Sequence, residues 1–153
     1  MFVTLASQRR PVPDVASVPM KELKRYRIEL ECDYEEWWRY NLYISAACYD
    51  ADGGIADYVN LSDKVYDIGS GIESRTRPAG YARGAKVTLE TPPCVRAEFF
   101  LYAVANTFPH SDIIRNSPPC AAAVACYTDG RLTERTEYAV NQWGGLTLKK
   151  ELG

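Results

Sequence analysis

The sequence predicts an all-β fold, specifically an antiparallel β-sandwich of two sheets with long connecting loops. Apolar and polar residues alternate over 24–33 and again over 41–49, as they do in half-buried strands. No stretch shows a long helical period. Several short strands separated by turns are typical of β-sandwiches, so these observations together indicate the fold class.

The first half of the chain supplies a pair of strands joined by a tight turn. The strand over 24–33 leads through a polar and aromatic connection into the strand over 41–49. The turn at 51–54 reads Ala-Asp-Gly-Gly, and Asp and Gly tolerate the positive φ that such a turn needs. We therefore expect residues 55–61 to return as the partner strand.

The second half repeats the pattern. Further strands are expected at 87–89, 95–105, 120–127 and 131–140, with long loops at 67–86 and 106–119. An internal echo accompanies them, because Ala-Cys-Tyr precedes an Asp-Gly turn both at 47–53 and at 125–130. This echo predicts two similar hairpins in similar places in the two sheets.

The domain organisation is simple. A chain of 153 residues suits one compact domain with a sizeable core. Residues 1–22 hold Pro11, Pro13 and Pro19 with little apolar periodicity, and we interpret them as a mobile or loosely packed N-terminal arm. The single β-sandwich domain is then expected to span 23–153.

The charge balance and hydropathy exclude several partners. The chain has 18 basic and 20 acidic residues, which leaves no basic footprint for nucleic acid and no polybasic membrane patch. No apolar run approaches the ~18 residues of a membrane span. At the N-terminus the short apolar stretch precedes the basic pair Arg9-Arg10, the reverse of a secretory signal. We expect an intracellular, cytoplasmic protein.

The cysteines give no metal-binding pattern. They are Cys32, Cys48, Cys94, Cys120 and Cys126, an odd number without a C-x-x-C pair. Zinc sites usually want closely paired ligands, so we expect free, mostly buried thiols in a reducing compartment. No metal or other cofactor is predicted.

The sequence motifs do not form a complete set of catalytic residues. A nucleophilic enzyme needs a nucleophile, a base and an orienting group, and the only histidine is His110, in the polar Pro-His-Ser-Asp turn at 109–112. Gly69-Ser70-Gly71 matches neither a nucleophile elbow nor a phosphate-binding loop. The sequence therefore predicts a protein that is not an enzyme.

The turn that begins at Asp50 raises the question of calcium. Asp50, Asp52 and Gly53 resemble the start of an EF-hand loop. A third acidic or Asn ligand before the glycine is missing, and Leu61 stands where the bidentate Glu belongs. A hairpin turn is the favoured interpretation, and a weak surface calcium contact is the alternative.

The order of the expected strands and loops resembles that of a known protein family. Leu23-Lys24 opens the first strand, an acidic connection follows, and the second strand begins Asn41-Leu42-Tyr43. A Gly-rich loop, an apolar strand and a strand that ends in an Asp-Gly turn come next. Over about residues 23–140 this order resembles the TerD family of tellurium-resistance and calcium-binding stress proteins.

The sequence departs from that family at the positions where the resemblance implies calcium ligands. The resemblance implies two carboxylate ligands in the second strand, where Asn41 and Tyr43 stand instead. The family's loop is rich in Gly, Asp and Glu, whereas the loop here carries Arg75, Arg77 and Arg83, with Glu73 its only glutamate. Positive charges oppose a bound cation, so the resemblance implies a relative that has lost its calcium.

Two stretches are candidate binding sites. Arg75, Arg77 and Arg83 lie among glycines whose N–H groups could face an anion, or they belong to a solvated loop. In the second stretch, Trp37, Trp38 and Tyr40 follow two glutamates. We expect one tryptophan to pack inward, while the other either closes an end of the sandwich or presents a sugar- or protein-binding face.

These features predict a non-catalytic binding module. The leading hypothesis is protein–protein interaction by a metal-free, TerD-like β-sandwich. The alternative is a small-ligand module that holds a carbohydrate or an anion at the Trp37 and Trp38 region or at the arginine loop. A hydrolase ranks third, because its constellation is incomplete.

Overall fold

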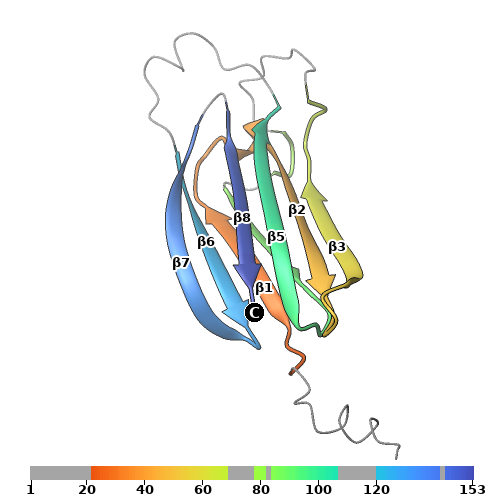
Figure 1. The fold of residues 1–153 in the computed structure, drawn as a ribbon. Coiled ribbons are helices and arrows are strands. Elements are labelled where there is room, and N and C mark those ends of the chain that lie inside the picture. Colours follow the sequence, from red (N-terminus) through yellow and green to blue (C-terminus); the bar gives the residue numbers. More distant parts are fainter. Residues whose placement is uncertain (1–21, 69–77, 82–83, 107–119, 142–143) are drawn as a thin grey trace, which may run out of the picture.

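The computed structural model describes residues 22–68, 78–81, 84–106, 120–141 and 144–153 (Figure 1). These residues form two four-stranded antiparallel sheets packed face to face, which confirms the predicted fold class. The strands are β1 (Tyr26–Cys32), β2 (Tyr40–Tyr49), β3 (Ile55–Asp63), β4 (Ala85–Glu90), β5 (Arg96–Ala105), β6 (Cys120–Thr128), β7 (Arg131–Val140) and β8 (Leu146–Leu152). A 3-10 turn, η2 (Trp37–Arg39), leads into β2.

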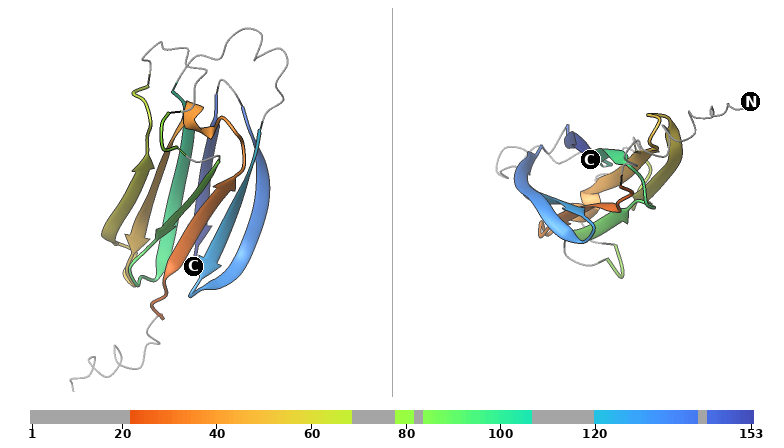
Figure 2. Two further views of the ribbon diagram at one scale, coloured as in Figure 1. Left: turned by 180° about the vertical axis from the view of Figure 1, so that it is seen from behind. Right: turned by 60° about the horizontal axis from the view of Figure 1, so that its bottom comes forward.

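The two sheets draw equally on both halves of the chain. One sheet has the order β4-β1-β6-β7 and the other β3-β2-β5-β8. The second sheet forms the front layer of Figure 1, and the first sheet comes forward when the molecule is turned (Figure 2). Because β1 pairs with β6 and β2 pairs with β5, each sheet contains two strands from the first four and two from the last four.

The strands expected from alternation are present, with small differences in length. The partner strand expected at 55–61 continues to Asp63, and the short strand expected at 87–89 spans 85–90. The final segment, 146–152, forms β8 beside β5. The polar and aromatic connection after β1 contains the 3-10 turn η2.

The internal echo corresponds to two hairpins with the same irregularity. The β2–β3 hairpin lies at one edge of its sheet and the β6–β7 hairpin at one edge of the other. In both hairpins the register shifts between a buried cysteine and the tyrosine that follows, at Cys48/Tyr49 and at Cys126/Tyr127. Such a shift inserts an extra residue and sharpens the twist before the turn. The predicted similarity of the two hairpins is confirmed.

The core lies between the two sheets and consists of the inward-facing residues of every strand. Its largest fully buried aliphatic side chains are Ile28, Leu30, Leu42, Ile44, Leu101, Val124 and Val140. Burying one such side chain contributes roughly 1.5–3 kcal/mol relative to leaving it exposed. These side chains come from both sheets, so their packing holds the two layers together.

An ion pair bridges the sheets where the edge strands β7 and β8 meet. Lys150 points inward from β8 and contacts the Glu134 carboxylate of β7 at 2.5 Å. Its ammonium also lies 5.5 Å from the centre of the Tyr138 ring. The hydrogen bond from Lys150 lowers the pKa of the Glu134 carboxyl group and raises that of Lys150. A charged side chain can therefore occupy an inward position here because its partner stands opposite.

A glycine in the turn before β8 allows that strand to lie against β5. Gly145 has a φ of +67° and exchanges backbone hydrogen bonds with Asn141. A Cβ at this position would overlap the backbone oxygen of Ala103 in β5. Gly130, in the β6–β7 turn, has a similar φ of +78°, but a Cβ there would meet nothing within 4 Å.

We expect Gly145→Ala to destabilise the fold by more than about 3 kcal/mol, because it combines an unfavourable φ with a backbone overlap. Gly130→Ala is the matched control and should cost only the ~1–2 kcal/mol of the left-handed conformation. Urea denaturation of both variants measures the difference. Equal losses in the two variants would contradict the close approach of the turn to β5.

Candidate functional site

The two tryptophans singled out in the sequence are both buried. Trp37 is 0% exposed and Trp38 is 1% exposed, while Tyr40 is 4% exposed. Trp37 belongs to the core between the sheets and stacks on Tyr40, with ring centres 5.2 Å apart. This confirms that one tryptophan packs inward.

Trp38 points elsewhere because η2 turns the chain between the two residues. Its ring meets Tyr66 edge-on at 6.5 Å, and the Arg39 guanidinium lies 4.7 Å from its centre. Arg39 in turn donates a hydrogen bond to Glu36 at 2.9 Å. The burial of Trp38 favours the alternative in which it closes an end of the sandwich. Trp37, Trp38 and Tyr40 are thus assigned to packing in this structure.

A buried amide network fastens this end of the molecule. Asn106 donates its side-chain N–H groups to the Trp38 carbonyl at 3.0 Å and to the Asn41 side-chain oxygen at 2.9 Å. Asn41 donates to the Tyr66 carbonyl at 2.6 Å and accepts from the Val65 amide at 3.3 Å. Asn41 occupies a position at which the family resemblance implies a carboxylate. Here its side chain hydrogen-bonds to the backbone of Val65 and Tyr66 instead.

The turn that begins at Asp50 is a hairpin turn, as predicted. It joins β2 to β3, and Gly53 within it has a φ of +83°. One oxygen of the Asp50 carboxylate accepts hydrogen bonds from the amides of Asp52 and Gly54, both at 3.0 Å. The carboxylate therefore stabilises the turn itself. Within the described ranges, no group of three or more acidic, Cys or His side chains is arranged to hold a metal ion.

Several candidates from the sequence fall outside the described residues. They are Arg75, Arg77 and Arg83 of the arginine loop and His110. The anion-binding hypothesis for the arginine loop stays a prediction. For the part of the chain that is described, no helix has the length and apolar character that crossing a membrane requires.

The outer face of the β3-β2-β5-β8 sheet carries exposed aromatic rings. Tyr58 is 64% exposed, Phe100 45% and Tyr102 44%. Tyr43 pairs directly with Tyr102 across β2 and β5, and their ring centres are 6.4 Å apart. These four residues, Tyr43, Tyr58, Phe100 and Tyr102, are called the aromatic face below.

Small and charged residues surround these rings. Ser45 and Ala47 stand on β2 between Tyr58 and the rings of β5. On β5 and β8, an ion-pair network contains Arg96, Glu98, Lys149 and Glu151. Lys149 also lies 5.8 Å from the centre of the Phe100 ring. The aromatic face therefore has an apolar centre with a charged border along β8.

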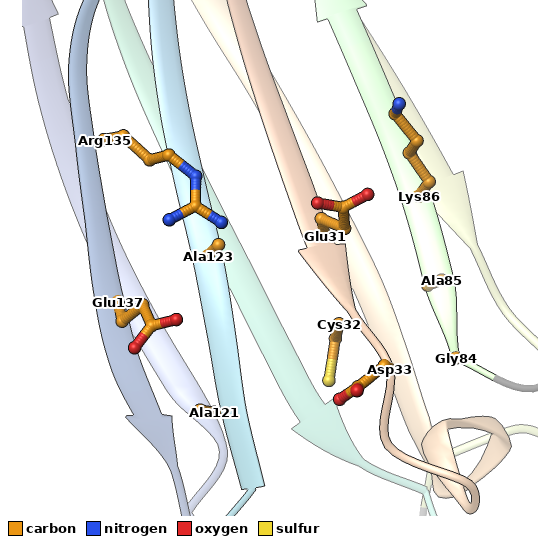
Figure 3. Close-up of a pocket in the computed structure, with 10 residues that line it drawn as sticks. All are labelled: Glu31, Cys32, Asp33, Gly84, Ala85, Lys86, Ala121, Ala123, Arg135 and Glu137. Carbon is orange, nitrogen blue, oxygen red and sulfur yellow. The ribbon is translucent and has the colours of Figure 1, made fainter.

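The outer face of the other sheet has a different composition, and it is called the charged face below. Its outward residues on β1 and β4 are Arg27, Glu29, Glu31, Lys86, Thr88 and Glu90. They lie beside an alanine stripe on β6, formed by Ala121, Ala123 and Ala125. A cleft of about 610 Å³ lies over Ala121 and Ala123 of this stripe (Figure 3). Arg135 extends from β7 over Ala123, and Glu31 stands on the other side of β6.

Sequence reasoning missed the aromatic face because the strand at 95–105 is almost continuously apolar. Alternation alone could not tell which of its residues point outward. The pairing with β2 decides this, because Tyr43 lies on the face opposite Leu42 and Ile44, and its partner Tyr102 must share that face.

Comparison of the chain with family models, with curated proteins and with solved structures finds no match.

We expect Trp37→Ala and Trp38→Ala each to cost about 3–5 kcal/mol of folding free energy, because each removes a fully buried indole. Tyr58→Ala is the control, since it removes an exposed ring and should cost less than about 1 kcal/mol. Urea denaturation measures all three. A tryptophan variant with wild-type stability would contradict the packing role of that residue.

We expect millimolar calcium to leave the melting temperature unchanged, because the amides of Asp52 and Gly54 already engage the Asp50 carboxylate. A site that binds the folded state alone would add about 2.7 kcal/mol at a hundredfold excess over Kd. Thermal melts in calcium, in magnesium and in chelator provide the test. A rise specific to calcium and reversed by chelator would contradict this expectation.

Proposed function

We propose that this chain is a non-catalytic β-sandwich that binds a protein partner through its aromatic face. The observation that carries the proposal is the gathering of exposed apolar side chains on one sheet. Seven large apolar side chains are exposed among the described residues, and four of them, Ile55, Tyr58, Phe100 and Tyr102, point outward from this sheet. Clustered exposed apolar side chains mark interaction sites more often than scattered ones do.

The chemistry of the face supports a protein rather than a small ligand. Tyr and Phe are enriched at the centres of protein interfaces, which are bordered by polar residues. Tyr43, Phe100 and Tyr102 are adjacent on β2 and β5, and the border includes Glu98 and Lys149. Small ligands are usually held in concave sites that bury most of their surface, whereas these rings stand on the open face of a sheet.

Folding does not require aromatic side chains at these outward positions. Phe100 and Tyr102 alternate with Ala97, Phe99 and Leu101, which already supply the inward side of β5 to the core. On the other sheet the outward positions of β1 are charged. The difference between the two outer faces therefore supports a binding role for the aromatic one.

A relationship to the TerD family stays part of the proposal as a hypothesis about origin. The predicted loss of calcium ligands agrees in chemistry with the structural use of Asn41. In this hypothesis the β-sandwich is retained and the interaction surface replaces the metal as the functional element. Binding of a carbohydrate at the aromatic face, in place of a protein, is tested by the same variants.

We expect Phe100→Thr and Tyr102→Thr to weaken partner binding by roughly thirtyfold or more each, the loss typical of an interface anchor. Threonine keeps the β-propensity of the position, so the melting temperature should change little. Glu137→Thr, on the charged face, is the matched control and should bind as the wild type does. Binding is measured by affinity capture from native lysate, followed by titration of the captured protein.

Three outcomes would contradict the proposal. One is that both threonine variants capture the same proteins as the wild type. Another is that Glu137→Thr loses binding equally. A third is that a glycan array shows sugar binding that Tyr102→Thr abolishes while protein capture persists, which would favour the small-ligand alternative.

A further inference from the structure

The outward residues of the β3-β2-β5-β8 sheet lie in rows that cross all four strands (Figure 1). In the central row the register partners are, in strand order, Asn60, Ser45, Phe100 and Lys149. A small side chain, Ser45, therefore stands directly beside a large exposed ring, Phe100. Ala47, the next outward residue of β2, is only 5% exposed, because its taller neighbours surround it. The face thus has a recess along β2 beside a projection on β5.

A second copy of this face complements the central row. A two-fold axis that runs parallel to the strands, between β2 and β5, sets β5 of one chain against β2 of its partner and β8 against β3. Phe100 then lies over the partner's Ser45, so the ring enters the recess. Residue pairs across a two-fold interface occur twice, because the same patch is used by both subunits. The projection of each copy therefore fills the recess of the other.

The two flanking rows match under the same rotation. In one row Tyr43 pairs with Tyr102, so each lies against the other's equivalent in the partner, ring against ring. In the other row Tyr58 of β3 and Glu151 of β8 are the outer members. The Tyr58 hydroxyl group can then donate a hydrogen bond to the partner's Glu151. Packed sheets turn by up to about 30° relative to each other, so the match is closest in the central row.

The charges on this face allow two copies to meet. Arg96 and Lys149 balance Glu98 and Glu151 in one ion-pair network, and the whole chain has a net charge of only −2. Little like-charge repulsion therefore opposes self-association. Glu98 would lie over the partner's small Ala47, but its carboxylate already accepts a hydrogen bond from Tyr49 and contacts Lys149. It can enter an interface without losing these partners.

The size of the face is adequate for a dimer. Four strands are about 19 Å across, and ten residues of β2 or β5 extend for about 34 Å, which gives a flat outline of about 650 Å². Side chains that stand on the sheet add accessible area to this outline. A stable interface of standard size buries about 800 Å² on each partner. The whole face is therefore of the scale that a specific dimer needs.

We propose that the partner of the aromatic face is a second copy of this chain, and that the two β3-β2-β5-β8 sheets pack face to face about a two-fold axis. This inference rests on the proposed function, since it names the protein that binds there. The charged face is less suited to the same contact. There the rotation would bury the Glu31 carboxylate against the partner's Ala123, and a buried charge without a partner is costly.

The first test is the mass of the full chain in solution, measured by sedimentation equilibrium. We expect twice the mass of one chain at micromolar concentrations. Phe100→Ser and Ser45→Phe should each weaken the dimer by roughly thirtyfold or more, the loss typical of an interface anchor. The first variant leaves two recesses empty, and the second sets ring against ring twice. Thr88→Phe, which adds a ring to the charged face, is the matched control and should remain dimeric.

The second test restores the match between the two positions. The double variant Ser45→Phe/Phe100→Ser exchanges projection and recess, so it should dimerise again. An equimolar mixture of the two single variants should form a heterodimer, because each contact then has one ring and one serine. Native mass spectrometry distinguishes the heterodimer from either single variant, and circular dichroism confirms that every variant is folded. Only direct contact between positions 45 and 100 of different copies predicts both recoveries.

Three results would overturn the inference. The first is a wild type that stays monomeric over the whole concentration range. The second is a dimer that neither single variant weakens. The third is a folded double variant that stays monomeric, or a mixture of folded single variants without a heterodimer. A monomeric wild type that captures a different protein, and loses it in Tyr102→Thr, would overturn this inference but leave the proposed function in place.

Discussion

The structure depends on one constraint, the register that turns the apolar residues of each central strand toward the opposite sheet. Leu30, Ile44 and Leu101 are all 0–1% exposed because every second residue of β1, β2 and β5 faces inward. A shift of one residue would expose this whole row and bury the alternate one. Once Leu101 is inside, Phe100 and Tyr102 must be outside. The core thus decides which positions are outward, but leaves their chemistry free.

This constraint also joins the two halves of the chain. β1 finds its partners in β4 and β6, and β5 finds its partners in β8 and β2. Neither the first four strands nor the last four can complete a four-stranded sheet alone. The shared bulge at Cys48/Tyr49 and at Cys126/Tyr127 places corresponding hairpins at the sheet edges. The sequence similarity between 47–53 and 125–130 therefore reflects a two-fold arrangement of the sandwich, in which β1–β4 correspond to β5–β8.

Alternation in the sequence was sufficient to predict most strands and the sandwich, because half-buried strands show their inward faces directly. It did not identify 146–152 as a strand, since Lys149 and Lys150 interrupt its apolar pattern. Lys150 faces inward only because Glu134, on a strand of the other sheet, neutralises it. A side chain whose position depends on a distant partner cannot be placed by local pattern.

The candidate sites were less predictable for the same reason. The burial of Trp38 depends on its edge-on contact with Tyr66, which lies far along the chain. The outward position of Phe100 depends on the pairing of β5 with β2. Each of these features depends on tertiary contacts between residues that are far apart in the sequence. The Asp50 turn, by contrast, was predictable because its hydrogen bonds run to the next few residues of the chain.

The edges of the sheets narrow the way in which a partner can bind. Charged side chains lie along the edge strands, including Asp57 on β3, Lys86 on β4 and Arg135 on β7. Charges on edge strands, and above all an inward-pointing one such as Lys150 on β8, oppose the addition of another strand. If the proposed partner binds at the aromatic face, its recognition would then come from side chains that stand on the sheet rather than from the backbone of an edge strand. Specificity would reside in the spacing of a few rings, which the pairing of β2 with β5 holds fixed.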